Sequence, residues 1–175
     1  IIIENDLVFT AVGNQEFKIS SDPIPASKWL FTKYDRFNRS VMTGFVMLSG
    51  TPKEIQDQVN NVTDFEVAYV GDVANDVLGY DNTAYPQVAS ESDVLTVTYY
   101  DNYDFKDDFS WGFDFEETGH NDAVIGQLTG SLTRELGGSL LRSINYYDER
   151  FRPLYTVNEN HLGGTDKVRT LYDNL

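Results

Sequence analysis

The feature that most constrains the fold of this chain is an internal repeat built around the dipeptide Tyr-Asp. Residues 33–43 align without a gap on residues 146–156, and the Tyr, the Asp, the Arg and the last Thr of the two stretches are identical. Shorter copies of the dipeptide occur at 100–101 and at 172–173. Internal repeats usually build surfaces by stacking one supersecondary unit on the next. The repeat therefore favours an architectural role over chemistry in every unit.

Each of these copies follows a segment whose composition is typical of a β-strand. β-Branched and aromatic residues, which suit a pleated and half-buried surface, are frequent at 29–33, 94–99, 140–145 and 168–171. An Asp that follows a strand suits a turn, because its carboxylate accepts bonds from backbone N–H groups one or two residues on. Each copy is therefore expected to end a strand in a turn.

In the two long copies a second strand is expected directly after the turn, at 40–46 and at 154–157. Strand, Asp turn, Arg and strand together predict a β-hairpin. The Arg is expected to return to the Asp or to stack on the Tyr ring, and both roles are structural. The predicted repeat residues are Tyr34, Asp35, Arg39, Tyr100, Asp101, Tyr147, Asp148, Arg152, Tyr172 and Asp173.

These residues resemble the YD repeats of the Rhs family of large bacterial surface and polymorphic-toxin proteins. The family unit reads Tyr-Asp, two residues, Gly-Arg and an apolar residue. The Gly position holds Asn38 in one copy and Phe151 in the other. Asn tolerates a left-handed backbone, whereas Phe does not favour it, so we expect the second turn to have another shape. The copy at Tyr100 departs further, since it has no Arg at the matching place.

The wider resemblance is to Rhs-like proteins of the Bacteroides group, and its carriers are 29–35, 98–105 and 160–166. It implies a segment of a YD-repeat scaffold, secreted or on the bacterial cell surface. The partners would be neighbouring repeats of the same polypeptide and, as in such shells, a C-terminal cargo. The chain opens on Ile1 and closes just inside a Tyr-Asp copy, so we expect a segment of a longer protein.

Composition agrees with a folded and mainly β protein. The 175 residues fit one domain or two small ones, and an aromatic content of 14% favours strands. The net charge of −15 predicts repulsion from nucleic acid and anionic lipid. There is no Cys, which excludes disulfides and thiol catalysis, and no apolar run long enough to span a membrane. No cofactor is expected.

We predict a single β-rich segment over 1–175 whose antiparallel hairpins form a curved or open sheet with one short helix. The first hairpin region covers 1–50, a helix and an irregular excursion cover 51–93, and further repeat units with a meander cover 94–175. The helix is expected at about 52–61, because Thr51 and Glu54 form a capping box and Pro52 fits the first turn. Within the excursion, 65–70 is predicted as a strand and 76–92 as a long loop.

The segment 101–122 contains eight acids and one Lys, with aromatic residues at every second position from Phe109 to Phe115. If the segment is extended, period two places the rings on one face of a strand, laid on the core with the acids outward. The alternative is a carbohydrate-binding module in which rings stack on sugars and carboxylates accept hydroxyl bonds. Its expected ligand surface within 101–117 is Trp111, Phe113 and Asp104.

Two further alternatives stay open, a glycoside hydrolase and a calcium site. A glycoside hydrolase needs only two suitably spaced carboxylates, and Asp101 with Asp104 would serve, although 28 acids produce such pairs by chance. The same region offers oxygen ligands of the kind that calcium binds, but its spacing is not that of an EF-hand. No nucleophile motif and no phosphate-binding loop is present. The sequence therefore predicts a protein that is not an enzyme.

Overall fold

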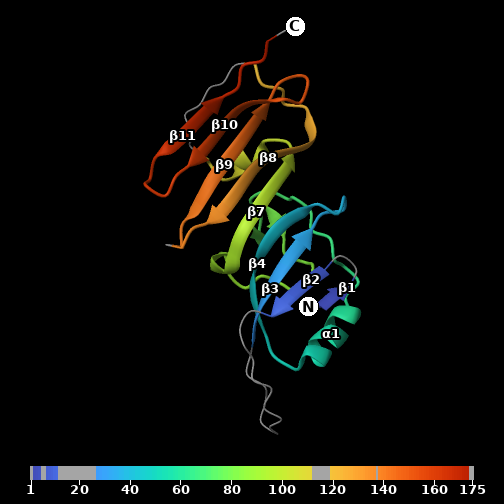
Figure 1. Cartoon of the computed structure of the whole chain (residues 1–175). Coiled ribbons are helices and arrows are strands. Elements are labelled where there is room, and N and C mark those ends of the chain that lie inside the picture. Colours follow the sequence, from blue (N-terminus) through green and yellow to red (C-terminus); the bar gives the residue numbers. More distant parts are fainter. Residues whose placement is uncertain (1, 5–6, 12–26, 112–118, 137, 174–175) are drawn as a thin grey trace. The chain divides into compact units, whose positions relative to one another are not determined.

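The computed structural model describes residues 2–4, 7–11, 27–111, 119–136 and 138–173 (Figure 1). Its described residues are mainly β, in antiparallel sheet with short helices, as the sequence predicts. The chain divides into two compact units, Ile1–Leu95 and Thr96–Leu175. Their boundary lies two residues beyond the start of the predicted repeat and meander region at 94.

In the first unit, four of the described strands pair in chain order. They are β1 (Ile2–Glu4), β2 (Leu7–Ala11), β3 (Ser27–Tyr34) and β4 (Ser40–Leu48), and every pairing is antiparallel. β3 and β4 form the predicted first hairpin. Alternate side chains of β3 (Trp29, Phe31 and Lys33) are buried, because successive strand residues point to opposite faces of the sheet.

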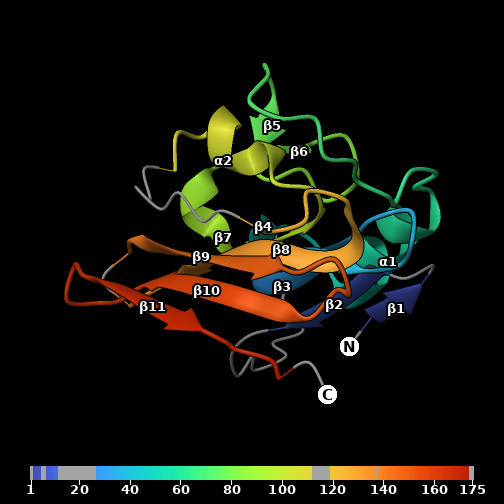
Figure 2. The ribbon, with the colours of Figure 1, turned by 90° about the horizontal axis from the view of Figure 1, so that it is seen from above.

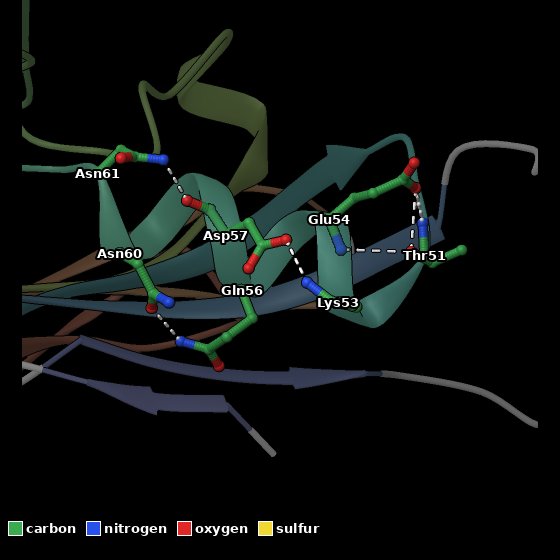
Figure 3. Close-up of polar contacts among 7 residues, drawn as sticks. All are labelled: Thr51, Lys53, Glu54, Gln56, Asp57, Asn60 and Asn61. Atoms are coloured by element: carbon green, nitrogen blue, oxygen red, sulfur yellow. Dashed lines mark hydrogen bonds and ion pairs between the residues drawn. The ribbon is translucent and has the colours of Figure 1, made fainter.

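The predicted helix forms as α1 (Pro52–Asn60). Thr51 Oγ1 accepts a hydrogen bond from the Glu54 backbone N–H, and the Glu54 carboxylate accepts one from the Thr51 N–H, so both halves of the capping box are present (Figure 3). Ile55 and Val59, one turn apart, are fully buried. The helix is thus fixed by its cap at one end and by an apolar stripe on one side.

The excursion between α1 and the second unit differs in part from its prediction. It holds the two-residue strands β5 (Asp76–Val77) and β6 (Tyr80–Asp81) and the 3-10 turn η1 (Glu91–Asp93). The strand predicted at 65–70 does not form. Its backbone bonds to two separate segments: Val67 N–H donates to the Tyr34 carbonyl, whereas Val70 N–H donates to the Gly79 carbonyl and the Ala68 carbonyl accepts from Asp81 N–H. No continuous ladder results, and only isolated bridges are present there.

The second unit is an antiparallel meander of five strands. They are β7 (Val94–Asp101), β8 (Val124–Arg134), β9 (Leu140–Tyr147), β10 (Pro153–Glu159) and β11 (Thr165–Arg169), and they pair in chain order. The meander is as predicted, although the last strand ends at Arg169 and does not extend to Tyr172. Val97, Leu132, Ile144 and Val157 are buried on one face of this sheet.

A second short helix, α2 (Asp104–Asp108), lies in the acidic segment 101–122. This segment was considered as a strand, on the condition that it is extended. Figure 2 shows α2 lying over the β8 and β9 side of the meander. The fully buried Phe105 ring explains the helical turn, because it packs where Gly130 of β8 has no Cβ, directly against that backbone. Residues 112–118, with Phe113 and Phe115 among them, lie outside the described residues.

Candidate functional site

The turn of the first long repeat is closed by the Asp35 side chain and backbone together. Asp35 N–H donates to the Arg39 carbonyl at 3.0 Å, and Asn38 N–H donates to the Asp35 carbonyl at 2.9 Å. Asp35 Oδ1 accepts from the N–H groups of Phe37 and Arg39, both at 2.9 Å. Asp35 Oδ2 pairs with the Arg39 guanidinium, at 2.7 Å from Nε and 2.6 Å from Nη2. One carboxylate therefore binds both the backbone of the turn and the side chain of Arg39, the residue at the end of the turn.

The turn of the second long repeat has the same contacts. Asp148 N–H donates to the Arg152 carbonyl, and Phe151 N–H donates to the Asp148 carbonyl, both at 3.0 Å. Asp148 Oδ1 accepts from the N–H groups of Arg150 and Arg152, and Oδ2 pairs with Arg152 Nε and Nη2, both at 2.7 Å. We call this arrangement the Asp–Arg lock and define it by Asp35 with Arg39 and by Asp148 with Arg152.

The expectation that the second turn has another shape is wrong. Asn38 has a φ of 60° and Phe151 a φ of 57°, so both take the left-handed conformation at the same step of the turn. A bulky residue is strained there. The six contacts of the lock are retained all the same, which indicates that the lock and the flanking strands impose the conformation on Phe151.

The two remaining hairpins of the meander use the same backbone turn. In the turns that begin at Glu135 and Asn160, the first residue donates to the carbonyl four residues on, and its own carbonyl accepts from the residue three on. Gly138 and Gly163 hold the left-handed position. Asn160 Oδ1 also accepts from Leu162 N–H and Gly164 N–H, the same two offsets that Asp35 Oδ1 uses. That these turns share one geometry was not predicted from the sequence, although the Gly-Gly pair in each of the two turns was a usable signal.

In the second turn the contacts of the lock favour the ionised form of the Asp148 carboxylate. The backbone N–H of Arg152 is the largest influence on the pKa of Asp148 and lowers it; desolvation opposes this, and the Arg152 guanidinium lowers the pKa further. An ionised acceptor gives shorter and stronger hydrogen bonds than a neutral one. The carboxylate and the guanidinium therefore both hold the turn. This arrangement suits a structural role better than acid–base catalysis.

The tyrosines of the long copies have different surroundings. Tyr147 is buried and its hydroxyl donates to the Leu128 carbonyl at 2.7 Å. Tyr34 is half-buried, and its carbonyl accepts from Val67 N–H. Tyr172 belongs with the second lock: the Arg152 guanidinium lies 4.0 Å from the centre of its ring, and its hydroxyl donates to the Pro153 carbonyl at 2.9 Å. Asp173 is exposed.

The copy at Tyr100 and Asp101 does not form a hairpin turn. Asp101 is the last residue of β7, has a φ of 75° and lies at a shift in the β7–β8 register. Its Oδ1 accepts from Gly126 N–H at 2.7 Å, so the carboxylate ties two strands at an irregularity. The expected turn is replaced by a bulge here, because the chain continues directly into α2.

The structure does not bring the predicted ligand surface together. Trp111 is only 7% exposed, and its ring lies edge-on to Tyr99 and Phe105, with centroids 5.7 and 4.8 Å away. Asp104 is exposed at the first position of α2, and Phe113 lies outside the described residues. A ring buried in the core has no face left for a sugar. Among the described residues no group of three acids or histidines has the geometry of a metal site.

Three features were missed by sequence reasoning. Tyr80–Asp81 is a further copy, and its Asp81 carboxylate caps Ala68 N–H and Thr83 N–H. Lys33 is 1% exposed, and its Nζ donates to the Ala84 carbonyl at 2.9 Å. The third feature is an open polar cavity of about 470 Å³ beside the first lock, lined by Tyr34, Asp35, Arg36, Asn38, Thr63, Asp64, Phe65 and Glu66.

Comparison of the chain with protein-family models, with curated proteins and with solved structures gives no match in any of the three. No helix among the described residues is long and apolar enough to cross a membrane. The function must therefore be argued from the geometry of the chain itself.

Proposed function

We propose that this chain is a structural segment of a YD-repeat scaffold in which Asp–Arg locks hold successive strand pairs in one sheet. The observation that carries the proposal is the reuse of one turn. Two turns separated by 113 positions share the same six hydrogen bonds and ion-pair contacts, and the polar atoms of Asp and Arg are directed at the turn itself. A side chain used in this way supports architecture.

The relation between Tyr172 and the second lock adds to this argument. Tyr172 is the Tyr of the next Tyr-Asp copy along the chain, yet it covers Arg152 of the preceding lock. Each unit would then complete the one before it, as nearest-neighbour contacts do in repeat proteins. The partner of this segment is accordingly other repeats of the same polypeptide, on a secreted or cell-surface protein with a cargo domain.

Structure determination of the full-length gene product by cryo-electron microscopy tests the proposal. We expect a strand of the same polypeptide paired along β11 and further Tyr-Asp turns with the same Asp–Arg contacts. A structure in which β11 is the true end of the sheet and no other lock occurs would contradict the proposal. A glycan array on the isolated chain tests the carbohydrate-binding alternative, for which binding that is lost in Trp111→Ala would count.

A further inference from the structure

β11 is the last strand in the sheet order of the described residues, and all five of its residues are exposed. The hydrogen-bonded pairs that flank it, Leu154 with Thr170 and Asn160 with Gly164, fix how its backbone alternates. Even-numbered residues bond to β10, so Thr165, Lys167 and Arg169 direct their N–H and C=O groups away from it. An open strand edge of this kind is a template for another strand.

The charges on β11 decide which strand the edge takes. Lys167 and Arg169 lie on one face of the sheet, opposite Val157 and Tyr155 of β10, while Asp166 and Val168 lie on the other face. In an antiparallel pair, residues directly opposite each other point to the same face, and like charges placed there are destabilising. The edge is therefore cationic on one face only.

A second copy of β11 meets a charge clash in each register that pairs at least three of its residues. A two-fold axis centred on Lys167 places the two Lys167 ammonium groups opposite each other. A shift to Asp166 opposes two carboxylates, about 4.5 Å apart at Cα. A shift to Val168 opposes Lys167 with Arg169 twice. Self-pairing through this edge is thus discouraged in all three registers.

We propose that the β11 edge rejects a second copy of this chain and accepts an antiparallel strand that presents carboxylates opposite Lys167 and Arg169. The inference rests on the proposed function in one respect, since that strand is the neighbour of β11 in the scaffold. This chain itself has carboxylates in excess, with 28 acidic and 13 basic residues, and neighbouring repeats of the same composition would supply such a strand. The charges on β11 thus determine which strand can pair with this edge, and the open backbone groups determine that a strand can pair there at all.

Sedimentation equilibrium of the intact chain tests the rejection of a second copy. The wild type is expected to be monomeric. Lys167→Glu is expected to dimerise, because the register centred on Val168 then contains two carboxylate–guanidinium pairs around an apolar contact. Addition of Arg169→Ala to that variant, or of 0.5 M salt (a Debye length of about 4 Å), is expected to dissociate the dimer. A dimeric wild type, or a folded but monomeric Lys167→Glu, would overturn the proposal.

Peptide binding tests the acceptance of an acidic strand. The blocked peptide Thr-Glu-Val-Glu-Lys-Thr and its control Thr-Lys-Val-Lys-Lys-Thr are titrated while the backbone amide signals of 165–169 are followed by NMR. Two favourable pairs in place of two repulsive ones predict about tenfold tighter binding of the acidic peptide. Equal binding, or binding of neither, overturns the proposal. In the full-length gene product, a strand on β11 without carboxylates would refute the charge rule and leave the scaffold intact.

Discussion

Phe151 occupies the same left-handed position in its turn as Asn38 does in the first, with φ angles of 57° and 60°. An aromatic residue in this conformation is strained, whereas Asn enters it at a lower cost. We predict that Phe151→Asn stabilises the protein by about 1 kcal/mol, which corresponds to a Tm increase of about 2–4 °C. Differential scanning calorimetry measures the change. Phe37→Asn, in the first turn where φ is not positive, is the matched control, and an equal gain there would refute the strain argument.

The contact between Phe105 and Gly130 predicts a steric cost. A Cβ added to Gly130 would collide with the Phe105 ring, which is fully buried. We expect Gly130→Ala to destabilise the protein by about 1–3 kcal/mol in urea unfolding. Phe105→Leu in the same chain should recover part of the loss, so that the two effects are not additive. Strictly additive losses would show that the ring and the glycine do not interact.

Lys33 predicts a pH dependence. Burial lowers its pKa from 10.5 to about 8, against the opposing charges of Asp81 and Asp64. Between those pH values the unfolded chain binds a proton that the folded chain does not, so stability rises with pH. The wild type should gain about 2 kcal/mol relative to Lys33→Met between pH 8 and pH 10. The comparison with Lys33→Met is needed because burial raises the pKa of Tyr103 and Tyr147, which lowers stability above pH 10 in both proteins. A difference that stays flat from pH 8 to 10 would contradict the prediction.

The lowered pKa of Asp148 predicts acid sensitivity of the second lock. The group is ionised in the folded state below its ordinary pKa of 3.8, so its contribution is complete above that pH and is lost as pH falls through the lower, folded value. Asp148→Asn keeps the shape of the side chain and removes the titration. Wild type and variant should therefore differ in Tm at pH 7 and converge as the pH falls well below 3.8, whereas a constant difference would exclude the carboxylate as the cause.

The parts of the fold that depend on local signals could be predicted from the sequence. The capping box at Thr51 and Glu54, the strand composition before Tyr34 and Tyr147 and the Gly-Gly pair near Leu136 each act within a few residues. They fixed α1, the two long hairpins and the meander. The return of Arg39 to Asp35 was one of two expected roles for the same reason, since both residues lie in one turn.

The parts that depend on distant partners could not be predicted. The helical turn at Phe105 exists because Gly130, 25 residues away, leaves space for a ring. The segment at 65–70 fails as a strand because its partners come from two different segments. Trp111 was expected on a core-facing row of rings or, in the alternative, on a ligand surface, and Tyr99 and Phe105 bury it. Phe151 was expected to change its turn, but propensity yields there to the six contacts of the lock.

The melting temperatures of Asp35→Ala and Asp148→Ala, beside that of Asp173→Ala, test the central claim most directly. Asp173 belongs to the same dipeptide but lies in no hairpin turn, so it controls for the loss of one acid from an acidic chain. The account predicts a loss of about 2 kcal/mol for Asp35→Ala, a decrease of Tm in the same direction for Asp148→Ala, and little change for Asp173→Ala. If both lock variants melt at the wild-type temperature, the Asp–Arg locks do not hold the turns and the structural account fails.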